Sequence, residues 1–264
     1  MTYGLPYQGS KSRIADKIVS LLPKADTLYD VFAGGCAITH AALLTYKYNH
    51  IVMNDITDVP QLFLDAAHGL YHDCRRWVSR SEFEMFKNAD PFIRVIYSFG
   101  NDCSTYMYGK DIEPYKKAAH QLICADTVMK RRKALREFVT QLSKISDSGQ
   151  AMRLESLQSL QSLESLERLE RLESLQQDYR TLTFKDDSVI YCDPPYKGTK
   201  QYATTGDFDS EAFYEWCRQQ TQPIFISEYS MPDDFECIAQ FKVKQLMCAK
   251  GGSSVIEKLF TLKH

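Results

Sequence analysis

The sequence predicts an α/β protein with a doubly wound, mostly parallel sheet and a helical lobe inserted between the two halves of that sheet. Three observations support this fold class. Short apolar runs alternate with segments of helical periodicity near both ends of the chain. The first of these runs leads into a glycine turn, and the next ends in an acidic residue. Between the two ends, residues 71–150 have a mostly helical pattern.

The amino-terminal half of the predicted sheet begins with a helix over residues 12–22, where apolar residues recur at helical spacing. A strand over residues 27–32 follows and runs into the glycine turn at residues 33–35. A helix over residues 38–46 and a strand over residues 50–55 come next, and this second strand ends in an acid. Strand, glycine turn, helix, strand and acid form the first half of a nucleotide-binding α/β sheet.

The carboxyl-terminal half resumes the alternation of strands and helices. The expected elements are strands over residues 189–192, 223–227, 241–248 and 256–262, and a helix over residues 210–220. The last two strands flank Lys250-Gly251-Gly252, a sequence typical of a hairpin. These elements divide the chain into a sheet domain at residues 1–70 and 178–264, a helical lobe at residues 71–150 and a connector at residues 151–177.

The connector contains a repeat in which leucine recurs at every third position from Leu154 to Leu175. Its residue types favour a helix, but a strict period of three would wind the leucines around the helix axis without forming one seam. A leucine zipper is therefore a poor interpretation. We expect a helical connector, with an extended conformation near its end left open.

Composition places the chain among globular proteins, with 264 residues of which 44% are hydrophobic and 25% charged. No apolar run approaches the roughly 18 residues that span a bilayer, and the amino terminus lacks a signal-peptide core. The eight cysteines are scattered, without a C-x-x-C pair or a histidine at ligand spacing. We therefore expect a cytoplasmic protein with reduced thiols, no metal site and no membrane association.

Charge is distributed unevenly along the chain. The formal net charge is −2, yet residues 75–144 contain fourteen lysines and arginines against eight aspartates and glutamates, a local balance of +6. One basic surface on a mildly acidic protein is what contact with phosphate requires. The same surplus also fits an ordinary solvated helical surface.

Asp193-Pro194-Pro195-Tyr196 follows an apolar strand and carries the clearest chemical signal in the chain. Two prolines in a row stiffen the turn and leave the carbonyl oxygens of Asp193 and Pro194 free to accept hydrogen bonds. The turn thus combines a carboxylate, a carbonyl and an aromatic face. An exocyclic aromatic amine that donates its two hydrogens to two such acceptors loses conjugation with its ring and becomes nucleophilic. A proline-rich exit from a strand is the alternative interpretation.

Four motifs occur in a fixed order along the chain. They are Tyr7-x-Gly9-x-Lys11, Asp30-Val31-Phe32-Ala33-Gly34-Gly35, Asn54-Asp55-Ile56 and Asp193-Pro194-Pro195-Tyr196. In this order they resemble the DNA adenine-N6 methyltransferases in which the cofactor motifs come first, the target-recognition region next and the catalytic turn last. The resemblance covers both halves of the sheet. It implies a Rossmann-like class I methyltransferase fold with the helical lobe as the target-recognition region.

The resemblance also implies a binding site for S-adenosylmethionine. Tyr7 and Lys11 would pack against the cofactor and hold its carboxylate, and Asp30, where the family usually has glutamate, would take the methionine ammonium group. Asp55 would accept hydrogen bonds from the ribose hydroxyls. Residues 32–34 would form the floor of the site, and residues 178–179 would line the adenine side. The implied cofactor set is Tyr7, Gly9, Lys11, Asp30, Phe32, Ala33, Gly34, Asp55, Ile56, Asp178, Tyr179 and Asp193.

The implied reaction is methyl transfer from S-adenosylmethionine to N6 of an adenine that leaves duplex DNA to reach the site. The Asp193 carboxylate and the Pro194 carbonyl would accept the two amine hydrogens, and Tyr196 would stack on the flipped base. Pro195 completes the catalytic turn. Neither a metal nor a covalent enzyme intermediate is needed, since positioning and electrostatics provide the acceleration.

A basic cluster in the helical lobe is the expected contact with double-stranded DNA. The candidates are Lys116, Lys117, Lys130, Arg131, Arg132, Lys133 and Arg136. A solvated helix face is the alternative interpretation. The resemblance favours phosphate contact, because the lobe stands where the family keeps its recognition region.

Two positions depart from the family pattern. Cys36 stands where the family commonly has the last glycine of the turn, and Val31 stands where it has a proline. Cys36 adds a Cβ atom at the turn, so we expect a lower cofactor affinity.

Several alternatives to adenine methylation remain at this point. Within the enzyme class, the acceptor could be cytosine N4, an RNA base or a protein amide, although Asp193 favours adenine, because cytosine-N4 enzymes usually have serine there. A nicotinamide oxidoreductase fits poorly, since G-x-G-x-x-G spacing is missing from the glycine turn. A catalytically idle DNA-binding module is the alternative from another class.

The sequence also bears on whether the protein acts alone or with partners. No nuclease motif accompanies the methyltransferase motifs. We therefore infer a solitary enzyme without a restriction partner, in a bacterial or phage-infected cell. We expect it to act as a monomer, with a dimer on DNA as the alternative.

Overall fold

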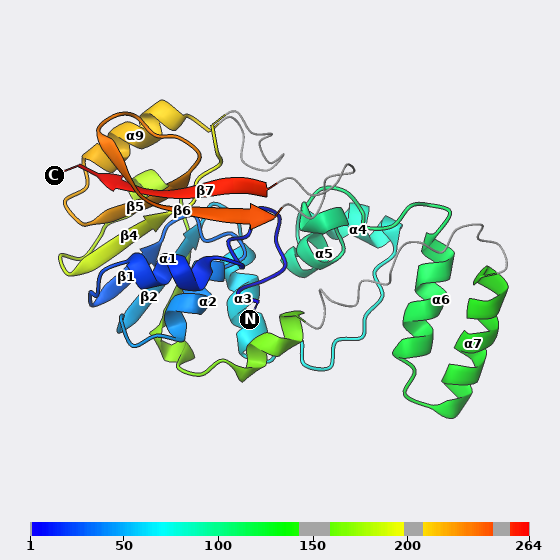
Figure 1. The fold of residues 1–264 in the computed structure, drawn as a ribbon. Helices are drawn as coiled ribbons and strands as arrows, with labels where there is room; N and C mark the ends of the chain where they lie inside the picture. The colour runs from blue at the N-terminus through cyan, green and yellow to red at the C-terminus, as the bar shows by residue number, and fades with distance from the viewer. Residues whose placement is uncertain (1, 143–158, 198–207, 245–253, 264) are drawn as a thin grey trace. The chain divides into compact units, whose positions relative to one another are not determined.

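The structure, a computed structural model, describes residues 2–142, 159–197, 208–244 and 254–263 (Figure 1). The chain forms two compact units. The first comprises residues 1–5, 9–68 and 165–264, and the second comprises residues 6–8 and 69–164. The first unit contains the sheet and the second is helical, so the leucine repeat is shared between them.

The first unit is built on a seven-stranded sheet with the strand order β3-β2-β1-β4-β5-β7-β6. Strands β1 to β5 run parallel, and β7 is antiparallel to both β5 and β6. The strands are β1 (Thr27–Asp30), β2 (His50–Asp55), β3 (Leu172–Gln176), β4 (Ser188–Cys192), β5 (Ile224–Glu228), β6 (Phe235–Lys244) and β7 (Ser254–Leu262). The doubly wound, Rossmann-like α/β fold predicted from the sequence is confirmed.

The sheet reverses its winding at β1, which pairs with β2 on one side and with β4 on the other. Asp30, the last residue of β1, is in register with Met53 of β2 and Tyr191 of β4. In open α/β sheets, ligands bind at the carboxyl ends of the strands where the order reverses. The glycine turn after β1 and the catalytic turn after β4 both leave the sheet at this point.

Helices and strands of the first unit enclose two hydrophobic cores. The helices are α1 (Ala15–Leu21), α2 (Ala37–Leu43), α3 (Val59–Ala67) and α9 (Ser210–Arg218). Leu28 and Tyr191 pack in a core with α1 and α2, whereas Tyr29 and Ile190 pack in a core with α9. Successive strand residues point to opposite faces of a sheet, so the continuous apolar runs of β1 and β4 supply both cores.

The described part of the leucine repeat is not the helix that its residue types favour. Residues 159–161 are helical, and two short 3-10 turns follow, η2 (Ser162–Ser165) and η3 (Leu169–Arg171). The repeat then ends as the edge strand β3, so the extended alternative is the one that forms. A spacing of three on a strand places Leu172 and Leu175 on opposite faces, and each packs against a different core. Partial burial of both leucines against the two cores favours the strand.

The second unit consists of helices α4 (Arg80–Phe86), α5 (Pro91–Ile96), α6 (Glu113–Ile123) and α7 (Val128–Leu142), with a 3-10 turn η1 (Phe99–Asn101). Ser79 and Glu82 form a capping box at the start of α4. Helices α6 and α7 lie side by side, with the Tyr115 and Phe138 rings 5.1 Å apart (Figure 1). Within the described ranges, no helix has the length and apolar character to cross a membrane.

Candidate active site and basic groove

The catalytic turn predicted at residues 193–196 begins directly after β4, and its aspartate forms an ion pair. Lys11, which precedes α1, places its Nζ atom 2.8 Å from Oδ1 of Asp193. Both side chains are shielded from solvent, with exposed fractions of 8% for Lys11 and 18% for Asp193. The structure therefore brings the first and last of the four sequence motifs together.

Tyr196 contacts Glu257, Tyr229 and Lys11. Its hydroxyl group donates a hydrogen bond of 2.6 Å to Oε2 of Glu257, a residue of β7. The Tyr229 ring meets the Tyr196 ring in a T-shaped arrangement, with centroids 4.6 Å apart. Lys11 Nζ lies 4.8 Å from the ring centroid and 3.7 Å from the Glu257 carboxylate. Lys11, Asp193, Glu257 and Tyr196 thus form one cluster, which we call the catalytic cluster.

A second buried carboxylate, Glu228 at the end of β5, holds the residue that follows the catalytic turn. Glu228 is 3% exposed and accepts hydrogen bonds from the backbone N–H groups of Lys197, at 2.7 Å, and Tyr229, at 2.6 Å. Sequence reasoning missed both Glu228 and Glu257. The signal for Glu228 was present, because an acid directly after a buried parallel strand lies at the edge where ligands bind.

The electrostatics of the catalytic cluster depend on Lys11. Burial raises the pKa of Asp193, and the Lys11 ammonium group opposes this rise through its charge and its hydrogen bond. The Glu257 carboxylate raises the pKa of Asp193 further. Desolvation disfavours an ionised carboxyl group, whereas a neighbouring cation favours it. Lys11 therefore favours the ionised form of Asp193 in a site with little contact to water.

The glycine turn after β1 is closed by hydrogen bonds from β2. Gly34, with φ of 47°, donates its N–H to Oδ2 of Asp55 at 2.9 Å, and the Ala33 N–H bonds to the Asn54 carbonyl at 2.8 Å. Cys36 has φ of 59°, in the left-handed region. This conformation explains why the family commonly has glycine at this position, because glycine adopts it without strain and cysteine does not.

The amino-terminal segment packs tightly against the same turn. Leu5 donates its N–H to the Gly35 carbonyl at 2.7 Å, and Gly4 donates to Nδ1 of His40 at 2.9 Å. A Cβ atom on Gly4 would lie 2.3 Å from the Gly35 oxygen, so only glycine fits there. Burial lowers the pKa of His40 to about 4, so the ring is neutral at physiological pH and accepts the Gly4 hydrogen bond.

Asp30 lies at the end of β1 and caps the start of α2. Its Oδ2 atom accepts hydrogen bonds from the Thr39 N–H, at 3.1 Å, and the Thr39 hydroxyl, at 2.7 Å. Burial raises the pKa of Asp30 to about 7, despite the opposing effect of these hydrogen bonds. The charge of Asp193 contributes to the rise, which shows that the glycine turn and the catalytic turn meet in one electrostatic environment.

Asp55 and Ile56 lie at the end of β2. The Asp55 carboxylate is largely occupied by hydrogen bonds, whereas the Ile56 side chain is exposed to solvent. Oδ1 of Asp55 accepts from the Thr57 N–H at 2.9 Å and the Thr57 hydroxyl at 2.8 Å, in addition to the Gly34 bond at Oδ2. Ile56, the next residue, is 52% exposed. A carboxylate beside exposed apolar surface is what the ribose and base of an adenosine require.

The aromatic residues predicted near the cofactor lie beside one another. The Phe32 and Tyr179 ring centroids are 5.3 Å apart, and both rings pack against Phe213 of α9. Asp178 caps the 3-10 turn η4 (Tyr179–Thr181) and forms an ion pair with Arg180. Its carboxylate is therefore engaged with its own turn.

The two remaining residues of the first motif fall in different units. The Gly9 carbonyl accepts a hydrogen bond of 3.4 Å from Lys11 Nζ, within the sheet unit. Tyr7 belongs to the helical unit, where the adjacent Gln8 N–H bonds to the Asn101 carbonyl at 3.3 Å. The cofactor contact expected of Tyr7 stays a prediction.

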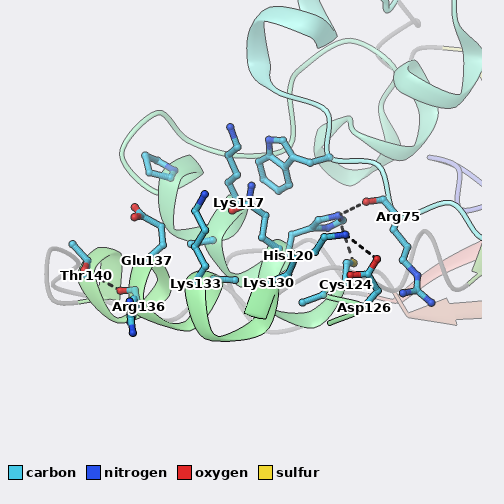
Figure 2. Close-up of a pocket in the computed structure, with 16 residues that line it drawn as sticks. Arg75, Lys117, His120, Cys124, Asp126, Lys130, Lys133, Arg136, Glu137 and Thr140 are labelled. Carbon is cyan, nitrogen blue, oxygen red and sulfur yellow. Dashed lines mark hydrogen bonds and ion pairs between the residues drawn. The ribbon is translucent and has the colours of Figure 1, made fainter. Parts of the chain in front are cut away.

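A groove of about 880 Å³ lies along α6 and α7 in the helical unit (Figure 2). Basic side chains line it, among them Arg75, Lys117, Lys130, Lys133 and Arg136. Lys130 is paired with Asp126 at 2.9 Å, and the groove also contains Glu137. The lining of the groove is thus mainly basic, and the acids Asp126 and Glu137 neutralise part of its charge. Four of the seven lysines and arginines predicted to contact DNA line this groove.

The other predicted DNA contacts are placed differently. Arg131 and Arg132 are exposed on α7 but do not line the groove. Lys116 is only 2% exposed, and burial lowers its pKa. Helical spacing on α6 turns Lys116 away from the side occupied by the exposed Lys117, so its burial does not favour the expected phosphate contact, which stays a prediction.

The sheet order, the glycine turn and the Asp193-Pro194-Pro195-Tyr196 turn at the switch point together define a methyltransferase of the Rossmann-like class. A comparison with protein families identifies the D12 class N6 adenine-specific DNA methyltransferase family, whose profile matches residues 7–226. The chain belongs to this family and is a DNA adenine-N6 methyltransferase. No curated protein matches it closely. The adenine-N6 interpretation of the sequence is confirmed. The family assignment favours adenine in DNA over the alternative acceptors, which were cytosine N4, an RNA base and a protein amide.

Proposed function

We propose that this protein transfers a methyl group from S-adenosylmethionine to N6 of adenine at specific sites in duplex DNA, and that the target base is flipped out of the helix. One observation supports this proposal above the others. Asp193 lies at the sheet switch point as a largely shielded carboxylate whose ionised form Lys11 favours, next to a turn whose prolines free its carbonyl groups.

The residues at the carboxyl ends of β1 and β2 fit the proposed cofactor. Asp30 uses only Oδ2 for Thr39, so Oδ1 has no hydrogen-bond donor among the described residues and could accept the methionine ammonium group. Asp55 and the exposed Ile56 suit the ribose and the base. A carboxylate has about four acceptor positions, of which Asp55 uses three, so one is left for a ribose hydroxyl. When bound, the cofactor supplies an electrophilic methyl group on sulfur.

The chain's own residues would prepare the adenine amine. The Asp193 carboxylate and the Pro194 carbonyl accept its two hydrogens, which takes the nitrogen lone pair out of conjugation with the ring. Tyr196 stacks on the extruded base and offsets part of the few kcal/mol that extrusion costs. Fixed acceptors need no reorganisation during the reaction, so positioning and electrostatics account for the acceleration.

The groove of the helical unit would contact the DNA backbone. Lys117, Lys133 and Arg136 line it, and each is exposed. Lysine and arginine contacts to phosphate hold a protein on the duplex without reading its sequence. This groove would therefore provide affinity for DNA, and other residues of the helical unit would recognise the bases.

Incubation with labelled S-adenosylmethionine and mixed plasmid DNA tests the proposal. We expect label on adenine N6, and a loss of at least about 100-fold in rate for Asp193→Ala. Asp193→Asn retains an acceptor oxygen without the charge, so we expect it to lose less activity than Asp193→Ala. Transfer by Asp193→Ala at the wild-type rate would remove Asp193 from the mechanism. A wild-type protein that binds DNA without transfer would show that the protein is catalytically idle.

A further inference from the structure

We propose that Glu257 is a positioning residue of this enzyme, because its carboxylate anchors Tyr196 of the catalytic turn and holds Lys11 beside Asp193. Glu257 lies outside all four motifs and outside the part of the chain that matches the family, which ends at residue 226. The inference rests on the proposed function, since it assigns Glu257 a part in that reaction.

The antiparallel direction of β7 is what brings Glu257 to the site. In the pairing of β5 with β7, Glu228 is in register with Lys258, at the carboxyl end of β5. Glu257 precedes Lys258, so it lies just beyond the end of β5, at the edge of the sheet where the catalytic turn leaves β4. A strand parallel to β5 would place its carboxyl end at this edge. The reversed strand instead supplies an acid from its amino-terminal half.

The contact between Glu257 and Tyr196 is short and charge-assisted. The phenolic O–H donates to Glu257 Oε2 at 2.6 Å, within the range for hydrogen bonds from a hydroxyl to a carboxylate. Glu257 is 16% exposed, so water has limited access to the bond. The T-shaped contact with Tyr229 restrains the same ring, and together the two contacts fix both its position and its rotation.

Glu257 also sets the position of Lys11. The Lys11 ammonium group lies 2.8 Å from Asp193 and 3.7 Å from Glu257, on the Tyr196 ring face. Loss of Glu257 would remove one of the two carboxylates within 4 Å of Lys11 Nζ among the described residues, and with it the acceptor of the 2.6 Å bond from the Tyr196 hydroxyl.

A double-mutant cycle on kcat at saturating cofactor tests the route through Tyr196. We expect Glu257→Ala to lower kcat about tenfold, the effect of losing one charge-assisted hydrogen bond, with little change in KM for DNA. Glu257→Gln keeps an acceptor oxygen and should retain most of the rate. In the Tyr196→Phe background, Glu257→Ala should lower kcat less than about twofold. An equal loss in both backgrounds would show that Glu257 does not act through Tyr196 and would overturn that part of the inference.

A measurement that needs no activity separates this inference from the proposed function. In protein labelled with ¹³C at the tyrosine ζ carbon, the Tyr196 signal is identified by its absence in Tyr196→Phe. We expect this signal to move in Glu257→Ala and to return towards its wild-type position in Glu257→Gln. The exposed Glu236 of β6 provides the control, and Glu236→Ala should leave the signal in place.

The outcomes of the two measurements are distinct. An unmoved Tyr196 signal in Glu257→Ala overturns the inference, whether or not the protein methylates DNA. A moved signal with an unchanged kcat also overturns it, because the contact would then be structural only. A wild-type protein without methyl transfer contradicts the proposed function, while the signal still decides whether Glu257 anchors Tyr196.

Discussion

Lys11 and Asp193 lie 182 residues apart in the sequence, and their side chains form an ion pair of 2.8 Å at the carboxyl edge of the sheet. A buried carboxylate without a partner would take up a proton, because desolvation penalises its charge. The first motif of the chain thus supplies the charge that the last motif needs. In the proposed reaction, this relationship would give Lys11 a part in the chemistry as well as in the cofactor contact that the sequence suggested.

Lys11→Met tests the electrostatic part of this relationship. Burial already raises the pKa of Asp193, and loss of the lysine charge removes the group that opposes the rise. Less Asp193 is then ionised at neutral pH, so we expect kcat to fall at pH 7 and to recover partly as the pH rises. The measurement is the pH profile of kcat at saturating cofactor, whose acid limb should move to higher pH.

Lys11→Arg keeps the positive charge and is the matched control for Lys11→Met. Its acid limb should stay closer to that of the wild-type enzyme, although guanidinium geometry differs from that of an ammonium group. Thermal unfolding of each variant separates loss of structure from loss of charge. An acid limb that does not move in Lys11→Met contradicts the role of Lys11 in ionising Asp193.

Asp30→Asn should stabilise the fold above neutral pH. The pKa of Asp30 is about 7 in the folded protein against an ordinary value of 3.8, so the folded state holds the proton more tightly than the unfolded chain. The stability that the protonated form contributes is therefore lost as the pH rises through about 7. We expect the variant to gain up to about 4 kcal/mol at pH 8, measured by urea unfolding.

The same comparison at pH 4 is an internal control for Asp30→Asn, because Asp30 is protonated there in the folded protein and the gain should disappear. An asparagine oxygen can still accept both hydrogen bonds from Thr39. Calorimetry should also show weaker binding of S-adenosylmethionine by the variant, since the neutral amide offers no charge to the ammonium group. Equal stability of the variant and the wild type at pH 8 would contradict the raised pKa.

Substitutions at Cys36 should reveal the cost of its left-handed backbone. Alanine and glycine both remove the buried thiol, so their difference isolates the conformation, in which φ is 59°. We expect Cys36→Gly to be more stable than Cys36→Ala by about 1 kcal/mol. Denaturant unfolding measures this difference.

Ala41, in the middle of α2, is the matched control for Cys36. Its backbone is helical, so Ala41→Gly should lower stability by about 1 kcal/mol or more. Replacement of alanine by glycine should thus have opposite signs at two positions five residues apart. A loss of stability at both positions would show that the turn tolerates a side chain without strain.

Removal of two cations from the basic groove should weaken DNA binding for all sequences alike. We expect the double variant Lys133→Ala and Arg136→Ala to bind less tightly, with a salt dependence reduced by about one unit of slope for each lost phosphate contact. Fluorescence anisotropy at several salt concentrations measures both quantities. The exposed Lys17 and Lys24 of the sheet unit offer a control with the same change in charge. Equal slopes in the two double variants would contradict DNA contact at the groove.

Local sequence patterns were sufficient for most of the sheet. Apolar runs with acids or glycines at their ends predicted β1, β2, β4 and β5 within a few residues, because burial on both faces leaves a continuous apolar signal. The helices α1, α2 and α9 followed from the spacing of their apolar residues. Patterns of this kind reflect interactions between residues that are close in the chain.

Positions that depend on distant partners were not predictable in this way. The leucine repeat has helix-forming residues, yet its end becomes β3 because β2 offers an open edge and the two cores accept Leu172 and Leu175. Lys116 and Lys117 are equivalent in the sequence, and only the packing of α6 buries the first and exposes the second. Side chains such as these receive their environment from other elements.

The amino-acid sequence alone determined the fold class and the order of the motifs, and with them adenine methylation, because short-range patterns and turn chemistry are written in consecutive residues. The tertiary structure decided which charges meet. The pairing of Lys11 with Asp193 and the arrival of Glu257 on a reversed strand depend on strand order and register. Electrostatic interactions depend on the distance between charges and on their burial, and both are set only when the strands assemble into the sheet.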